Sequence, residues 1–157
     1  MIVLKIDIID DNELIIYLYN SIYRVDYKDE KKLEEMLRNL FVKLRKYYDI
    51  KIEGYYDVFV YIDYIYGMVL DLRRQGLEYY DFFDNQVDMK IMINKNRFLY
   101  LVDDYDIDLN KYRVYKLMNN IYLLPKKVLS NYELGRLVEN SKIIYDSEEI
   151  INKGIKI

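Results

Sequence analysis

The sequence predicts an α+β protein in which antiparallel β-hairpins pack against one long amphipathic helix, with a second, smaller hairpin-rich half. Three observations favour this fold class. Short segments in which apolar and polar residues alternate recur along the chain, in pairs around turn residues. A single long segment, 29–48, instead repeats its apolar residues every three or four positions, which is typical of a helix with one buried face. The 157 residues include no cysteine, so no disulfide framework is expected, and a chain of this length can bury a workable core.

Two hairpins around the helix are predicted for the first half of the chain. Residues 2–9 alternate, and an Asp-Asp-Asn turn leads into a second apolar run at 13–19. Residues 55–63 and 68–73 alternate in the same way. Between these hairpins, the apolar face of the predicted helix comprises Leu33, Met36, Leu37, Leu40, Phe41, Leu44, Tyr47 and Tyr48. A sheet with one face covered by this helix would bury both apolar surfaces.

The ends and the exposed face of this helix also carry signals. Asp29 or Asp26 is expected to be the N-cap residue, because a carboxylate accepts hydrogen bonds from the first free amide groups of a helix. Glu34 and Arg38 are four residues apart, so their side chains are expected to form an ion pair on the exposed face.

Two more hairpins are predicted for the second half. Residues 87–93 and 97–102 flank an Asn-Lys-Asn turn. Residues 112–118 and 121–124 flank Asn119-Asn120, a two-residue loop that suits the positive φ angles of a type I′ turn. The remaining predicted elements are a helix at 131–140, a strand at 141–145, a capped turn through residue 151 and a fraying tail after Gly154.

Residues 76–86 are the best candidate for a boundary, because they show the least periodicity. They are too aromatic for a free linker, so they are expected to pack. The predicted organisation is a hairpin–helix–hairpin module at 1–75, a packed connector at 76–86 and a second hairpin-rich module at 87–157. One continuous domain is the alternative.

Composition argues against most classes of enzyme. The chain has no histidine and no cysteine, so the commonest general bases, nucleophiles and transition-metal ligands are missing. We therefore expect a protein that is not an enzyme and that holds no cofactor and no metal. The net charge of −3 also removes the general attraction that nucleic-acid binders have for phosphate. No apolar run is long enough to span a membrane, and the predicted location is the cytoplasm.

Two acidic patterns have the residue types that bind metals, but each fits poorly. Asp104, Asp106 and Asp108 match the first ligands of a calcium loop, which then has Leu109 where the sharp turn requires glycine. We therefore expect no calcium affinity tighter than roughly millimolar. The carboxylates of a metal-dependent nuclease could come from neighbouring strands, at Asp57, Asp63 and Asp71. Acids that alternate with aromatic residues along a strand are more often an exposed sheet face.

Several segments resemble one family of proteins. In the first half these are Glu13-Leu14-Ile15-Ile16-Tyr17-Leu18, the following charged helix with Leu40-Phe41, and Gly67-Met68-Val69-Leu70-Asp71-Leu72-Arg73. In the second half these are 98–106, 113–123 and 137–144. Together they resemble the MecA-type adaptor proteins of low-GC Gram-positive bacteria, which deliver substrates to a Clp/Hsp100 unfoldase. The chain lacks the family's long acidic linker and the full helices of its second module.

The resemblance implies a non-catalytic cytosolic adaptor that acts through protein–protein contacts. Its first half would offer a client surface, and its second half would dock on the unfoldase. Aromatic anchors beside acidic residues are expected to form the docking surface, and the candidates are Tyr105, Tyr115 and Tyr122. The alternative is a nucleic-acid-associated accessory protein that uses a local aromatic and basic face.

Overall fold

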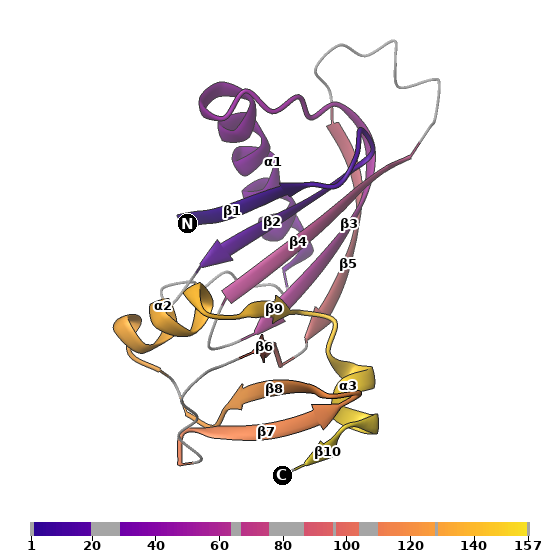
Figure 1. The fold of residues 1–157 in the computed structure, drawn as a ribbon. Helices are drawn as coiled ribbons and strands as arrows, with labels where there is room; N and C mark the ends of the chain where they lie inside the picture. Colours follow the sequence, from indigo (N-terminus) through magenta and orange to yellow (C-terminus); the bar gives the residue numbers. More distant parts are fainter. Residues whose placement is uncertain are drawn as a thin grey trace. The chain divides into compact units, whose positions relative to one another are not determined.

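The computed structural model describes residues 2–19, 29–63, 67–75, 87–95, 97–103, 110–127 and 129–156. Within these ranges the chain forms ten strands in two five-stranded sheets and three helices, which confirms the α+β class (Figure 1). Contacts divide it into two compact units: Met1–Leu18, Ile22–Val60 and Leu70–Ile93 form the first, and Tyr19–Ser21, Tyr61–Val69 and Asn94–Ile157 form the second. Three predictions lie outside the described residues, namely those for Asp26, the 76–86 connector and the Asp104–Asp108 loop.

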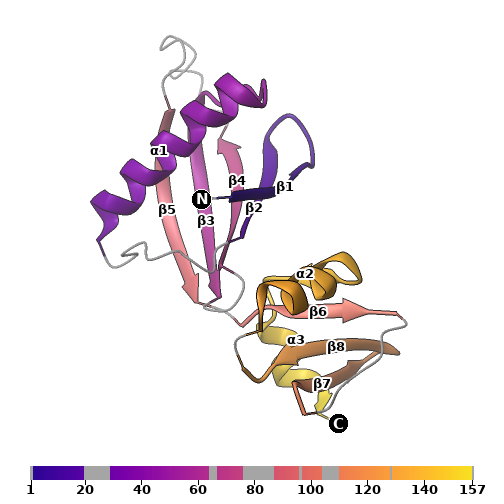
Figure 2. The ribbon, with the colours of Figure 1, turned by 90° about the vertical axis from the view of Figure 1, so that its left-hand side faces the viewer.

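The first sheet carries one helix on one of its faces, as Figure 2 shows. Its strands have the order β1-β2-β4-β3-β5, so the two predicted hairpins are neighbours and β2 pairs with β4. In chain order the elements are β1 (Ile2–Ile8), β2 (Glu13–Tyr19), α1 (Glu30–Tyr47), β3 (Gly54–Asp63), β4 (Gly67–Gln75) and β5 (Val87–Lys95).

Helix α1 follows its sequence pattern closely. The Asp29 side chain accepts hydrogen bonds from the amides of Lys31 and Lys32, as expected of an N-cap residue. The predicted pair is also present, with Arg38 Nη2 at 2.7 Å from Glu34 Oε1. The buried residues of the helix are Leu33, Leu37, Leu40, Phe41 and Leu44.

The predicted apolar face of α1 was wrong at its carboxyl end. Tyr47 and Tyr48 are 69% and 51% exposed rather than buried. The helix ends there, with the Tyr48 amide bonded to the Leu44 carbonyl. A tyrosine side chain tolerates this position because its hydroxyl can stay in water.

The two faces of the first sheet differ in chemistry. On β4, Leu70 and Leu72 are fully buried on one face, and Asp71 and Arg73 alternate with them on the other. The charged side chains therefore lie on the face of β4 opposite Leu70 and Leu72.

The second unit is built on a sheet with the order β10-β7-β8-β6-β9. In chain order its elements are β6 (Leu99–Val102), β7 (Tyr112–Leu117), β8 (Asn120–Pro125), α2 (Asn131–Glu139), β9 (Lys142–Ile144), α3 (Glu148–Lys153) and β10 (Ile155–Lys156). Ile150 and Ile151 of α3 pack against a cluster on one face of this sheet. In this unit α2 buries Leu134 and Leu137.

The hairpin of β7 and β8 is confirmed, with its turn one residue earlier than predicted. Leu117 pairs with Asn120, so the turn residues are Met118 and Asn119, with φ angles of 49° and 67°. Positive φ at both central residues is typical of a type I′ turn. Asparagine adopts this conformation readily, whereas methionine rarely does, and Met118 is 87% exposed.

Two predictions for the second half are corrected by the sheet order. Residues 87–93 and 97–102 do not form a hairpin, because β5 is an edge strand of the first sheet and β6 lies between β8 and β9 in the second. The tail after Gly154 does not fray, because Ile155 and Lys156 pair with β7. Within the described ranges, no helix is both long enough and apolar enough to cross a membrane.

Candidate functional site

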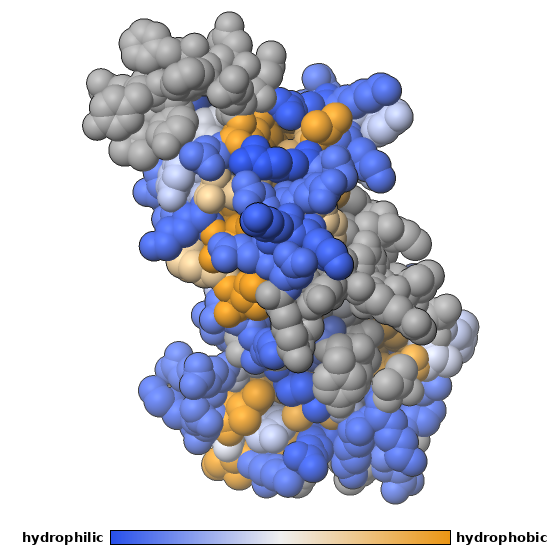
Figure 3. Space-filling model, turned by 180° about the vertical axis from the view of Figure 1, so that it is seen from behind, coloured by the Kyte–Doolittle hydropathy of each residue, from blue (hydrophilic) through white to orange (hydrophobic). Residues whose placement is uncertain are grey.

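Hydrophobic docking surfaces are not prominent on the face that Figure 3 shows. Among its coloured residues this face is mostly hydrophilic, and hydrophobic side chains appear in small separate areas. Polar cavities are therefore the better candidates for a functional site.

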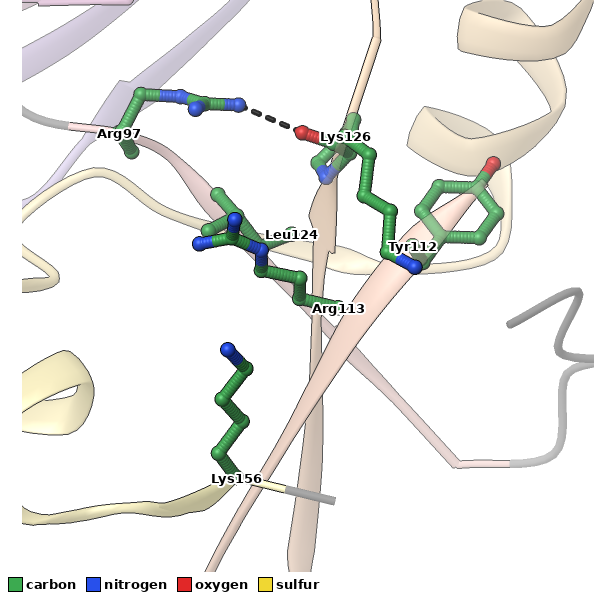
Figure 4. Close-up of a pocket in the computed structure, with 7 residues that line it drawn as sticks. Arg97, Tyr112, Arg113, Leu124, Lys126 and Lys156 are labelled. Atoms are coloured by element: carbon green, nitrogen blue, oxygen red, sulfur yellow. Dashed lines mark hydrogen bonds between the residues drawn. The ribbon is translucent and has the colours of Figure 1, made fainter. Parts of the chain in front are cut away.

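A basic pocket lies in the second unit, at the end of the β7–β8 hairpin away from its turn (Figure 4). Its volume is about 610 Å³, and it is lined by Arg97, Tyr112, Arg113, Leu124, Pro125, Lys126 and Lys156. Four of these seven residues are cations and none is an acid. This size is within the range of ligand pockets, roughly 300–1,000 Å³, although most ligand pockets are far less charged.

Strand pairing brings two of the cations to one face of the sheet. Arg113 of β7 lies opposite Leu124 of β8, and Lys156 of β10 lies opposite Tyr115 of β7. Because alternate residues of a strand share a face, Arg113, Tyr115 and Lys156 project to the same side. Figure 4 shows the Lys156 side chain extending toward the guanidinium of Arg113.

Arg97 reaches the pocket from the segment before β6, and its head group is held in place. Its Nη2 donates a hydrogen bond of 2.7 Å to the Pro125 carbonyl, and its Nε lies 3.6 Å from Asp63 Oδ2. Asp63 is buried and also accepts a 2.6 Å hydrogen bond from the Phe98 amide. The Ser147 hydroxyl donates to the Arg97 carbonyl, which further fixes this segment.

Two of the four pocket cations have no ion-pair partner among the described residues, whereas Arg97 lies beside Asp63. Arg113 and Lys156 form no ion pair with any other residue that the structure describes. Elsewhere in the unit, exposed lysines do have acidic neighbours, as in Lys111–Glu133 at 2.9 Å and Lys153–Glu149 at 3.1 Å. Cations that share a cavity repel one another, and a bound anion removes that repulsion. The arrangement is therefore suited to binding an anionic group.

Two of the predicted partner-binding tyrosines are buried in the core of the second unit and do not line the pocket. Tyr115 and Tyr122 face each other across β7 and β8 and are 7% and 8% exposed. Both belong to a buried cluster with Leu99 and Leu124. Tyr105 lies outside the described residues. That these tyrosines anchor a partner stays a prediction, and truncating either of the two buried rings would also leave a cavity in the core.

The three carboxylates considered for a nuclease have separate partners. Asp57 accepts a hydrogen bond from Gln75, Asp63 from the Phe98 amide, and Asp71 from Arg73. Among the described residues, no group of three or more acids is arranged to hold a metal ion.

Sequence reasoning missed the pocket because its cations come from four separate segments. Only the basic pair Lys126-Lys127 indicated a basic site locally. In a chain whose basic residues are interspersed with acids, such a pair is more often solvated surface. No protein-family model, curated protein or solved structure matches the chain, so its function has to be argued from the geometry of this site.

Proposed function

We propose that the protein is a non-catalytic adaptor that acts through protein–protein contacts, and that its second unit binds an acidic segment of its partner in the basic pocket. The observation that carries this proposal is the set of four cations around one cavity with no acidic residue in its lining. A binding role also agrees with the absence of histidine and cysteine from the sequence.

An acidic polypeptide fits the pocket better than a single small anion does. The cavity of about 610 Å³ is much larger than one carboxylate or phosphate group, so several acidic side chains can enter together. Arg113 can bind a carboxylate through two parallel hydrogen bonds, and Lys156 can add a point charge next to it. The pre-positioned Arg97 offers a third contact whose orientation needs no further ordering.

The partner that the sequence resemblance suggests is a Clp/Hsp100-type unfoldase, to which the first unit would bring clients. This part of the proposal rests on the resemblance, and it has its own experiment. The purified chain is mixed with the unfoldase of the same organism, and complex formation is followed by analytical ultracentrifugation. The absence of a complex at concentrations on the order of tens of micromolar would exclude the unfoldase as the partner.

The pocket itself is tested with a labelled polyglutamate peptide by fluorescence anisotropy. Arg113→Ala and Lys156→Ala should each weaken binding about tenfold, or about 1.4 kcal/mol. Lys116→Ala is the matched control, because Lys116 is an exposed lysine of the same strand that does not line the pocket. A polyglutamine peptide of equal length should not bind. If the pocket variants bind polyglutamate as the parent does, the pocket is not the docking site.

A nucleic-acid-associated accessory protein is the second candidate, and the same four cations favour it, since they also suit phosphates. Against it stand the net charge of −3 and the acidic residues interspersed along the chain. A labelled single-stranded oligonucleotide separates the two functions in the same assay. Tighter binding of the oligonucleotide than of polyglutamate, with a steep loss of affinity on adding salt, would favour the nucleic-acid function.

A further inference from the structure

Three charged side chains meet where β2 pairs with β4 in the first unit, on the sheet face opposite Leu70 and Leu72. Arg73 of β4 donates from Nε to Glu13 Oε2 of β2 at 3.1 Å and from Nη2 to Asp71 Oδ2 at 3.0 Å. The Arg73 guanidinium also lies over the Phe59 ring of β3, 4.5 Å from its centroid. One arginine therefore bridges two carboxyl groups from neighbouring strands.

Asp71 has a hydrogen-bonding deficit that Arg73 does not remove. The residue is 2% exposed, and its second oxygen, Oδ1, is buried with no hydrogen-bond partner among the described residues. Water cannot reach this oxygen, and a buried acceptor without a donor costs about 1–3 kcal/mol, more when it is charged. A proton on a neighbouring carboxyl group would supply the missing donor.

Glu13 is the group that can supply this donor. The phenol of Tyr17, which also lies on this face of β2, is hydrogen-bonded to Asp7 of β1. The Glu13 carboxyl lies next to Asp71, because one Arg73 guanidinium donates to both, and the two carboxyl groups can hydrogen-bond to each other. Two ionised carboxylates in contact have no hydrogen to share, whereas a protonated Glu13 donates one.

We propose that Glu13 and Asp71 share one proton, which Glu13 donates to the buried Oδ1 of Asp71, and that this proton locks β2 to β4. The cluster then holds one carboxylate, one neutral carboxyl and one guanidinium, so its charges balance. Without the proton, two negative charges would face each other beside a single arginine.

Burial of Glu13 and the neighbouring Asp71 raise the pKa of the Glu13 carboxyl, and Arg73 opposes them. Asp71 also acts on the Tyr17 phenol, more weakly than Asp7 does, and two further pairs of described residues lie on this face. Lys5 lies 3.4 Å from Asp7 on β1, and Asp57 of β3 accepts a hydrogen bond from Gln75. These pairs leave Glu13 and Asp71 to be balanced by Arg73.

The sign of the pH dependence follows from a folded-state pKa above the unfolded value. Stability from the shared proton is fully present below the unfolded pKa of Glu13 and is lost as pH rises through its folded pKa. Rising pH should therefore weaken the pairing of β2 with β4. Carboxylates in ion pairs usually behave in the opposite way, because the stability they contribute is lost as pH falls.

Carbon-13 NMR of the full chain, labelled at its glutamate carboxyl groups, tests the shared proton. The parent protein should show one glutamate resonance whose pKa is raised above the usual range, and Glu13→Gln should remove it. Glu149→Gln is the control, since Glu149 is an exposed carboxylate paired with Lys153, and it should leave that resonance in place. No late-titrating glutamate in the parent, or one that survives in Glu13→Gln, would overturn the proposal.

Urea denaturation tests the lock. The denaturation midpoint of the parent should fall as the pH rises through the folded-state pKa of Glu13, whereas that of Glu13→Gln, whose amide always donates, should stay level. Equal pH profiles for the two proteins would show that the proton does not hold β2 to β4. If Glu13→Gln does not fold, the NMR titration of the parent alone still decides whether the proton is shared.

Discussion

Replacing Phe41 with alanine tests the core between α1 and the first sheet. Phe41 is 1% exposed, and its helix neighbours Leu37 and Leu44 are fully buried. Removal of the ring leaves a cavity that these close-packed neighbours can fill only in part. The expected cost is about 3–5 kcal/mol. For a unit of fewer than about 100 residues, about 4–8 °C is lost per kcal/mol, so the melting temperature of the first unit should fall by more than about 10 °C.

Calorimetry is the assay of choice, because two compact units can unfold in separate transitions and the melting peak of the first unit is the one that should move. Val42→Ala provides the matched control. Val42 is the next residue of the helix and is 51% exposed, so its truncation should change stability by no more than about 0.5 kcal/mol. If Phe41→Ala melts within about two degrees of the parent, α1 does not pack on the sheet through this face.

Two further predictions concern the second unit. Asp63→Ala removes the acceptor of the Phe98 amide and the carboxylate beside Arg97, so urea denaturation should show a loss of about 3–5 kcal/mol. Asp63→Asn, which can still accept from the amide, should lose less, and equal losses would contradict this role of the carbonyl oxygen. A hydrogen bond from Lys111 lowers the pKa of Glu133, so the stability it contributes is present above the unfolded pKa and is lost as pH falls through the folded one. Thermal melting followed by circular dichroism at acidic pH should therefore show a weaker pH dependence for Glu133→Gln than for the parent.

Elements with a strong local period could be predicted from the sequence. The buried leucines of α1 recur every three or four residues, which depends on the helix period alone. Asp29 accepts hydrogen bonds from amides only two and three residues further along, so this cap is also a local feature. The hairpin of β7 and β8 is equally local, since its turn directly joins the two strands. Tyr47 was wrongly predicted to be buried, because the apolar period does not show at which residue the sheet stops covering the helix.

Strand partners could not be predicted, because an apolar run does not identify its neighbour. The four residues of β6 are apolar and suit the middle of a sheet, but whether β5 or β8 lies beside them depends on the packing of the whole unit. The pairing of β10 with β7 is another contact of this kind.

The candidate site was missed for the same reason. Arg113 and Lys156 line one pocket only because β10 returns to β7 late in the chain. Tyrosine rings bury large apolar area in cores as well as at interfaces, and here Tyr115 and Tyr122 lie in the core.

The place of β6 within its sheet has a kinetic consequence. Its two neighbours, β8 and β9, both come later in the chain, and β7 intervenes before either can be reached. To form such non-local pairs, the chain must first close a long loop, and this costs conformational entropy before any contact stabilises the pair. Folding is slower for this reason. The hairpin of β7 and β8 can form early, whereas β6 has to wait unpaired, with apolar side chains on both faces. Refolding of the second unit should thus be the step most exposed to aggregation, and β6 the segment through which chains would associate.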